Sequence, residues 1–594
     1  MADFQNPRLS RRVLLGSIAA VPAAAAMARA RLPLTAPLAR ARPGSATWPS
    51  QPQWDALSSE VGGRLIPAGR PSTPPPAALL SNPFYVGDQV WLTQSSGWVG
   101  AWRSEPSVYA VHAQSASDVA AAVRFAARHR LRLVIKGGGH SYLGGSNAPD
   151  SLLVWTRAMD RIEIHDAFVP HGCRSAPVPA VSVGAGCIWG RVYRAVSVES
   201  GRYVQGGGCT TVGVAGLIQG GGFGSFSKGF GLAAASLLEA EIVTADGRVR
   251  VVNAEREPDL FWALKGGGGG TFGIVTRLTL QTHELPETIG AVRFTVQATS
   301  DEAFRRLLGD FVDFARRRLL DPHWGEQVRA TPSRRLVVEM NFQGIDGPTA
   351  EKVWQGFVGR VQANPGEWKI VQPFFALGIP GRRFWDADWF KSHVPQAIRP
   401  DDRPGAREGD YWWAGDGDQV GIYWAAYTSL WLPRSLLEES GKERLVDAWS
   451  AAARHAPVTF HFNKGLAGAS PEVLAASRNT AMNSEVLDAF ALAIIADGTA
   501  AAYPGWSEPD TRDAEAASAR VRAADQAIRA AAPNAGSYMS ECDYFLRDWK
   551  RACWGAHWRR LETIKRHYDP EGLFIVHHGV GSDRWRNNGF TRLT

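Results

Sequence analysis

The stretch that decides the fold runs from Val134 to Gly224. It opens with VIKGGGHSYLGGS (residues 134–146) and closes with QGGGCTTVGVAGLIQGGGFG (residues 205–224). In each half, three glycines are followed by a nucleophilic side chain, His140 in the first and Cys209 in the second. Glycine runs let backbone N–H groups approach a ligand closely, and successive N–H groups form concavities that bind phosphate oxygens. The pattern predicts a site for a phosphate-containing ligand with a nucleophile beside each loop.

Two other interpretations of the glycines fit the sequence less well. A flexible surface loop would explain one glycine run, but here two runs are both flanked by apolar residues. A Rossmann fingerprint needs a strand before G-x-G-x-x-G and a helix after it. The only such spacing, Gly268, Gly270 and Gly273, follows a helix-like segment (258–264) and precedes a strand-like one (274–280). The order is the reverse of a Rossmann site.

The pair GGGHSY and GGGCTTVGVAG…GGGFG resembles the berberine-bridge-enzyme-like branch of the vanillyl-alcohol-oxidase flavoproteins, which have a PCMH-type FAD-binding domain. The resemblance implies FAD bonded twice, through His140 to the ring methyl carbon and through Cys209 to a neighbouring ring carbon. It also implies the following residues around the cofactor: Gly137, Gly138, Gly139, Ser141, Gly144, Gly145, Gly208, Val212, Gly213, Gly216, Gly221, Gly222, Gly224, Gly273, Ile274 and Val275.

The chain of 594 residues is long enough for more than one hydrophobic core. We expect an α+β protein with a two-part FAD-binding domain over residues 101–285. Alternating strand-like and helix-like segments over 286–525 predict a substrate domain in which helices cover one face of an antiparallel sheet. Residues 526–594 resemble the family's C-terminal berberine-bridge segment, which returns to the FAD-binding domain.

The residues before the FAD-binding domain predict two further segments. SRRVLL (residues 10–15) and an alanine-rich apolar stretch predict a twin-arginine signal peptide over residues 1–30, read by the twin-arginine export machinery. Pro22 interrupts a stretch already short for a membrane span, so no stable membrane anchor is expected. Residues 31–100 are Pro-rich and predict an extended leader. Within it, residues 48–67 resemble the leader of isoamyl-alcohol-oxidase-like members. We therefore expect an exported protein, periplasmic or secreted.

Charge and cysteine content indicate which ligands to expect and which states the cysteines could have. The formal net charge is +8 without a Lys/Arg run, so no nucleic acid partner is expected. No Cys/His set has zinc-ligand spacing, and no metal is expected. Attachment of flavin at Cys209 would leave four cysteines: Cys173, Cys187, Cys542 and Cys553. Either Cys173 pairs with Cys187 or all four are buried thiols; the sequence leaves both open.

Local patterns predict several elements. Ser117 precedes apolar residues at helical spacing (119–126), which predicts a helix capped by Ser117. Residues 131–135 predict a buried strand that leads into the GGGH loop. Asp246-Gly247, between two apolar runs, predicts a hairpin turn.

The resemblance implies that the flavin accepts a hydride from a carbon beside a hydroxyl or, less often, an amine of a small-molecule substrate. A base must then take a proton. Tyr538 is the catalytic candidate, in Tyr-Met-Ser where the family has Tyr-x-Asn. Tyr538 keeps its place on the strand of that pattern, so alternation turns Glu541 and Asp543 to the other face. Its acidic partner stays open among Glu339, Asp386, Asp388, Asp416 and Asp418.

In this family the third residue after the attachment Cys governs access of dioxygen, with Val permissive and Leu obstructive. Val212 therefore implies an oxidase that makes hydrogen peroxide. The function is expected to be an exported oxidase of an alcohol-type carbon. Alternatives are a carbohydrate oxidase, an oxidative-cyclisation enzyme, or a non-catalytic flavin- or carbohydrate-binding protein. His140, Cys209 and Val212 together argue against the last.

Aromatic residues crowd between 374 and 431, and they admit two interpretations. They could form a wall above the flavin that stacks a sugar or encloses an apolar alcohol. They could equally be core packing, which we expect for most of them. The residues are Phe374, Phe375, Phe384, Trp385, Trp389, Phe390, Tyr411, Trp412, Trp413, Tyr423, Trp424, Tyr427 and Trp431.

Overall fold

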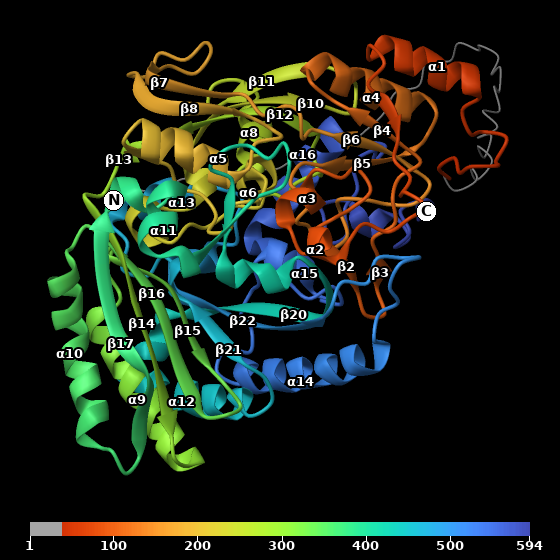
Figure 1. The fold of residues 1–594 in the computed structure, drawn as a ribbon. Helices are drawn as coiled ribbons and strands as arrows, with labels where there is room; N and C mark the ends of the chain where they lie inside the picture. The colour runs from red at the N-terminus through yellow and green to blue at the C-terminus, as the bar shows by residue number, and fades with distance from the viewer. Residues whose placement is uncertain (1–38, 594) are drawn as a thin grey trace, which may run out of the picture. The chain divides into compact units, whose positions relative to one another are not determined.

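A computed structural model describes residues 39–593. The predicted signal peptide lies outside the described residues. Three large sheets carry most of the structure, two in the FAD-binding domain and one in the substrate domain (Figure 1). No helix within residues 39–593 is long and apolar enough to cross a bilayer.

The first sheet of the FAD-binding domain has the order β1-β4-β6-β5. Its strands are β1 (Leu65–Pro67), β4 (Tyr109–His112), β5 (Arg132–Lys136) and β6 (Ser151–Trp155), with β6 parallel to β4 and β5. Helix α4 (Ala116–Arg128) buries its apolar stripe in the core beside this sheet. The cap of this helix is Ser115, not Ser117, since Ser115 accepts from the Asp118 N–H and Asp118 bonds back to the Ser115 N–H.

The second sheet is antiparallel, in the order β11-β10-β12-β8-β7. Asp246-Gly247 lies in the turn between β10 and β11, as predicted. A helix (α8) precedes the third glycine cluster and β12 follows it, the reverse of a Rossmann unit. The elements are β7 (Ile162–Phe168), β8 (Val178–Gly184), α6 (Val214–Gln219), β10 (Leu237–Val243), β11 (Val249–Asn253), α8 (Pro258–Ala263) and β12 (Ile274–Gln281).

The substrate domain is built on a nine-stranded sheet in the order β17-β14-β16-β15-β21-β22-β20-β2-β3. All neighbours are antiparallel except β2 and β20. The strands are β2 (Ser95–Trp98), β3 (Trp102–Arg103), β14 (Thr288–Ala298), β15 (Trp324–Ala330), β16 (Arg335–Gln343), β17 (Trp368–Pro380), β20 (Gly421–Pro433), β21 (Val458–His461) and β22 (Ala489–Thr499).

Four helices cover one face of this sheet: α9 (Asp301–Arg318), α10 (Gly347–Ala363), α12 (Glu439–Ala453) and α14 (Thr511–Arg529). Alternate residues of β14, such as Val292, Phe294 and Val296, pack under them. The side chains between these residues point to the opposite face, away from the helices. The predicted α+β class is confirmed.

Residues 39–100 are folded where an extended leader was expected. Helix α1 (Gln51–Glu60) buries Trp54, whose ring lies 4.8 Å from Phe125 of α4. Strand β2 completes the large sheet more than 300 residues from its partner β20. Apolar and aromatic residues between the prolines provide this packing, so Pro content alone was a poor guide.

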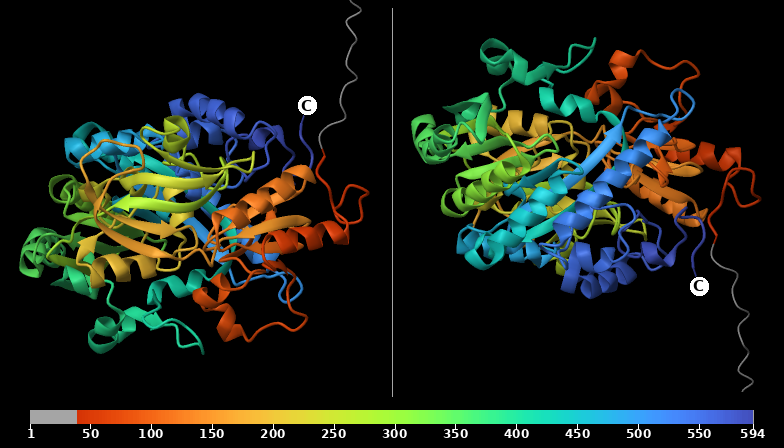
Figure 2. Two further views of the ribbon diagram at one scale, coloured as in Figure 1. Left: turned by 90° about the horizontal axis from the view of Figure 1, so that it is seen from above. Right: turned by 90° about the horizontal axis from the view of Figure 1, so that it is seen from below.

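The C-terminal segment returns to the FAD-binding domain (Figure 2). Helices α15 (Trp549–Trp554) and α16 (Trp558–Tyr568) lie against the third glycine cluster, where Trp554 Nε1 donates to Gly266 O and Lys565 Nζ to Thr271 O. The remaining short elements are α2 (Ala77–Leu80), α3 (Pro83–Gly87), α5 (Trp189–Tyr193), β9 (Arg202–Tyr203), α7 (Ser227–Phe230), β13 (His283–Glu284), α11 (Ala387–His393), β18 (Ile398–Pro400), β19 (Tyr411–Trp413) and α13 (Pro471–Arg478).

Candidate active site

A cavity of about 1790 Å³ lies between the glycine loops and the helix-free face of the nine-stranded sheet. That volume exceeds the roughly 300–1,000 Å³ of pockets for drug-sized ligands. His140, Cys209, Val212 and Tyr538 all line it. So do these residues expected around the cofactor: Gly137, Gly138, Gly139, Ser141, Gly144, Gly145, Gly208, Gly213, Gly216, Gly273 and Val275.

Four expected residues do not line the cavity. A Cβ on Gly221 would strike Met482, one on Gly222 would strike Leu217, and one on Gly224 would strike Gly206 O. These glycines therefore allow close packing behind the cavity wall. Successive side chains of a strand point to opposite faces. Val275 therefore faces the cavity, and Ile274 is buried in the core with α4.

The two attachment loops touch backbone to backbone. A Cβ on Gly138 would lie 2.6 Å from Gly213 N, and one on Gly213 would lie 2.8 Å from Gly138 N. His140 Nε2 is 3.1 Å from Thr211 Oγ1, in hydrogen-bond contact with the Cys209 loop. The close approach brings His140 and Cys209 to one wall of the cavity.

The wall formed by these loops fits a flavin dinucleotide. Gly208 and Gly216 both line the cavity, and a Cβ on either would meet nothing within 4 Å. Burial lowers the pKa of His140 to about 4, which leaves a neutral, nucleophilic imidazole. Burial, followed by the nearby Asp416, raises the pKa of the Cys209 thiol. Burial also raises the pKa of Asp416, to about 6.

Comparison with known proteins agrees with this geometry. Residues 108–253 match the family model described as FAD binding domain, and residues 537–581 match the one described as berberine and berberine like. The FAD-linked oxidoreductase notD′ of Aspergillus versicolor is 30% identical over 598 residues, covering 93% of this chain and 90% of that protein. The chain belongs to the berberine-bridge-like branch of the vanillyl-alcohol-oxidase (VAO) flavoproteins. It is an FAD-linked oxidoreductase of that family.

Solved structures share the fold. A VAO-type flavoprotein of Myceliophthora thermophila, at 21% identity, covers 94% of this chain and 100% of its own, with a TM-score of 0.75. A second from the same organism, at 23% identity, covers 92% and 98%, with a TM-score of 0.72. The glucooligosaccharide oxidase of Acremonium strictum, at 20% identity, covers 82% and 94%, with a TM-score of 0.61; its structure describes a 6-S-cysteinyl, 8α-N1-histidyl FAD.

Residues 381–420, the covering segment, lie over the Cys209 loop of this VAO-family protein. Trp413 Nε1 donates to Gly208 O at 3.1 Å, and Thr210 Oγ1 donates to Tyr411 O at 2.6 Å. The covering segment also supplies Asp416, which lines the cavity and helps to raise the pKa of the Cys209 thiol. It thus forms the part of the cavity wall beside the attachment cysteine.

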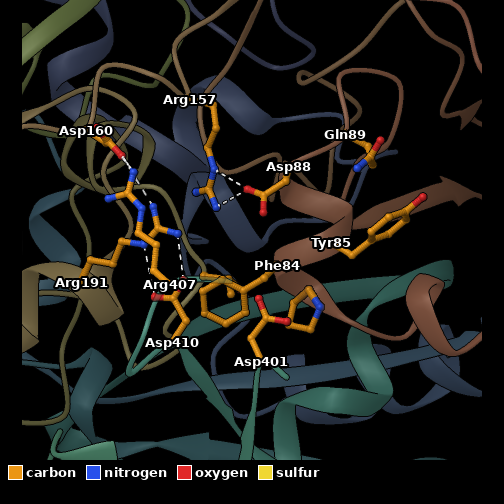
Figure 3. Close-up of polar contacts among 12 residues, drawn as sticks. Phe84, Tyr85, Asp88, Gln89, Arg157, Asp160, Arg191, Asp401, Arg407 and Asp410 are labelled. Atoms are coloured by element: carbon orange, nitrogen blue, oxygen red, sulfur yellow. Dashed lines mark hydrogen bonds and ion pairs between the residues drawn. The ribbon is translucent and has the colours of Figure 1, made fainter. Parts of the chain in front are cut away.

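Ion pairs hold the covering segment to the FAD-binding domain (Figure 3). Arg191 pairs with Asp410 at 2.8 Å, and Arg407 pairs with Asp160. Asp88, in the stretch expected as leader, bridges Arg157 at 2.7 Å and Arg403 at 3.0 Å. Most of these side chains are largely buried, so the pairs are screened less by salt than surface pairs are. The network fixes the wall that carries Asp416.

The prediction that Glu541 points away from the site is wrong. Residues 539–541 form a 3₁₀ turn rather than a strand, and side chains three apart share a side in such a turn. Glu541 therefore lines the cavity with Tyr538, and both its oxygens lie 2.7 Å from Lys464 Nζ. Asp543 does not line the cavity.

Among the tyrosines that line the cavity with Tyr538 are Tyr142 and Tyr427, whose ring centroids are 5.1 Å apart. Burial, followed by the charge of Glu541, raises the pKa of all three phenols. The phenols stay protonated at neutral pH, so they can donate hydrogen bonds but are poor proton acceptors. The sequence could have pointed to Tyr142 as a cavity residue, because it lies two residues after His140 in the GGGHSY motif. No motif of the sequence includes Lys464.

Of the five acidic candidates, Asp416 and Glu339 line the cavity. Asp386 instead caps α11 and pairs with Arg383. Asp388 pairs with Lys391 outside the cavity, and Asp418 is exposed.

The cysteines left open by the sequence are thiols. Cys173 Sγ donates to Asn253 Oδ1 at 3.4 Å and Cys187 Sγ to Arg161 O at 3.5 Å. Cys542 and Cys553 are buried and likewise unbridged. Within residues 39–593 the four are therefore thiols as in the second interpretation, but only three of them are buried, since Cys173 is half-buried.

We expected core packing for most of the thirteen crowded aromatics, but seven of them line the cavity: Phe375, Phe384, Trp385, Trp389, Phe390, Trp413 and Tyr427. The buried ones among the thirteen are Trp385, Phe390, Tyr411, Tyr423, Trp424, Tyr427 and Trp431. Phe375 differs, since nearly half of its surface is exposed while it lines the cavity.

Proposed function

We propose that this protein is an exported oxidase that removes a hydride from a hydroxyl-bearing carbon. The observation that carries the proposal is the meeting of His140, Cys209 and Val212 on one wall of a dinucleotide-sized cavity. The glucooligosaccharide oxidase named above, with its cysteinyl and histidyl FAD, supports the same double attachment here. When bound, FAD supplies the two-electron acceptor and passes the electrons to dioxygen, which gives hydrogen peroxide.

Two side chains of the cavity have different roles in our proposal: Tyr538 donates a hydrogen bond and Glu541 accepts the proton. A hydroxyl must lose its proton as its carbon loses a hydride. Tyr538 stays a neutral donor that orients the substrate oxygen, because its pKa is raised. Glu541 is the proton acceptor in our proposal, because it is a carboxylate that lines the cavity and is held there by its ion pair with Lys464. The proton moves from the substrate oxygen to a Glu541 oxygen.

A substrate panel tests the function. Oxidisable alcohols should bleach the flavin without air, and admission of air should restore its colour with one peroxide per turnover. Bleaching by oligosaccharides alone would favour the carbohydrate oxidase. A cyclised product would favour oxidative cyclisation. No bleaching by any compound would leave a non-catalytic flavin- or carbohydrate-binding protein.

Glu541→Gln is expected to slow anaerobic flavin reduction by about 10²–10⁴-fold, the usual contribution of a positioned base. The amide keeps the size of the side chain and cannot accept the proton. Rapid mixing with the best alcohol of the panel measures the rate.

Asp543→Asn is the matched control for that variant, because Asp543 lies two residues away and outside the cavity lining. It should reduce at the wild-type rate. If Glu541→Gln reduces its flavin at the wild-type rate while Tyr538→Phe reduces it much more slowly, the proton acceptor is Tyr538 and not Glu541.

We also propose export by the twin-arginine route, supported by Arg11-Arg12 and the apolar stretch that follows. Replacement of both arginines by lysine should hold the precursor, with its FAD, in the cytoplasm. Cell fractionation and immunoblotting measure this. Unchanged export of the double variant would refute the route.

A further inference from the structure

The register of the large sheet sets one row of side chains across the cavity. Phe375 pairs with Arg293, Arg293 with Glu339, Glu339 with Gln327, and Gln327 with His461. Directly paired residues point to the same face, and all five line the cavity. The row spans four inter-strand spacings, or about 19 Å.

The two ends of this row differ in chemistry. Its inner end leads to His461 and, three residues on, to Lys464, the partner of Glu541. Gln327 Nε2 donates to Glu339 Oε2 at 3.1 Å, and Arg293 Nη2 donates to Asn341 Oδ1 at 2.9 Å, so the middle of the row is polar. The outer end, on edge strand β17, is apolar.

Phe375 and Leu377 form an apolar ledge at that outer end. They are 48% and 41% exposed, stand two residues apart on one face of β17, and both line the cavity. Few large apolar side chains among residues 39–593 are as exposed as these. Ile379, further along the same face, extends the ledge toward Trp389 and Phe390 of the covering segment. Contiguous exposed apolar surface in a cavity points to an apolar ligand.

We propose that the ledge of Phe375 and Leu377 binds the apolar body of the substrate, an amphipathic alcohol whose hydroxyl end reaches Glu541. This proposal rests on the proposed function and adds the substrate class. The distance from ledge to inner end suits a molecule much longer than a simple alcohol.

Binding of alcohols that cannot react tests the ledge apart from turnover. A tertiary alcohol has no hydrogen on its hydroxyl carbon, so the series from 2-methyl-2-decanol to 2-methyl-2-octadecanol can bind the FAD-loaded protein without being oxidised. Perturbation of the flavin absorbance reports binding. Each added methylene should lower the Kd by up to about fourfold. Cellotriose should bind more weakly than the long alcohols.

The Phe375→Ser/Leu377→Ser variant should reduce that dependence to about twofold or less per methylene. Val371→Ser is the matched control, because Val371 lies on the same strand with 43% exposure but does not line the cavity. It should keep the wild-type dependence. Retained FAD and an unchanged Tm would show that each variant is folded. If the double variant does not fold, Phe375→Leu takes its place; this variant keeps an apolar side chain and should retain much of the wild-type dependence on chain length.

Three results would contradict the proposal that the ledge binds the apolar part of the substrate. One is a wild-type Kd that does not change with chain length. Another is equal dependence in the double variant and the wild type. A third is a wild-type dimer by sedimentation that the double variant dissociates without altering alcohol binding, since the ledge would then contact a second copy. Chain-length dependence without bleaching by any panel alcohol would instead refute only the oxidase function.

Discussion

Acid-denatured wild-type protein is expected to keep its FAD, and the His140→Ala/Cys209→Ala double variant is expected to release all of it. Both nucleophiles line the same cavity wall, where Gly138 and Gly213 hold their loops in contact. Each single variant should keep one link. Flavin fluorescence in a denaturing gel and the mass of the intact chain measure the attachment.

Cys187→Ala is the matched control for this experiment. Cys187 is a buried thiol of the same domain that does not line the cavity, so its loss should leave both links intact. Release of FAD from denatured wild type would show that neither link forms. Release from one single variant but not the other would show that only one residue is attached.

The second large effect is expected from Val212→Leu. Val212 is partly exposed to the cavity three residues after Cys209. Under the proposed oxidase function, dioxygen reaches the flavin past this side chain, and a leucine there would obstruct it. Flavin reduction should stay near wild type, while reoxidation should slow at least about tenfold, or about 1.4 kcal/mol in the barrier. Overpacking should cost about 1–3 kcal/mol of stability at most.

Mixing the pre-reduced variant with aerated buffer measures the reoxidation rate, and an artificial electron acceptor should restore turnover. Val212→Ala leaves the path open and should reoxidise as fast as wild type. If the wild type itself reoxidises slowly yet turns over well with the artificial acceptor, the protein is a dehydrogenase.

Local chemistry explains what the sequence could predict. The glycine triplets before His140 and Cys209 are short motifs whose backbone requirements are visible within a few residues. The helix of residues 116–128 and the hairpin at Asp246-Gly247 follow from local periodicity and turn preference in the same way. These features need no knowledge of distant segments.

Long-range register explains what the sequence could not predict. Lys464 reaches Glu541 across 77 residues, and no local pattern joins them. Phe375 faces the cavity only because β17 pairs with β14 in one register, and a shift of one residue would bury it instead. Glu541 was missed because a 3₁₀ turn replaced the expected strand.

The two faces of the nine-stranded sheet have different roles: side chains on one face stabilise the fold, and side chains on the other face are free to vary with the substrate. Along β14 and its neighbours, one set of alternate residues packs under α9 and α10, and the other set lines the cavity. Substitutions in the second set alter recognition without opening voids in the core. A family built on this sheet can diversify its chemistry while its architecture is inherited almost unchanged.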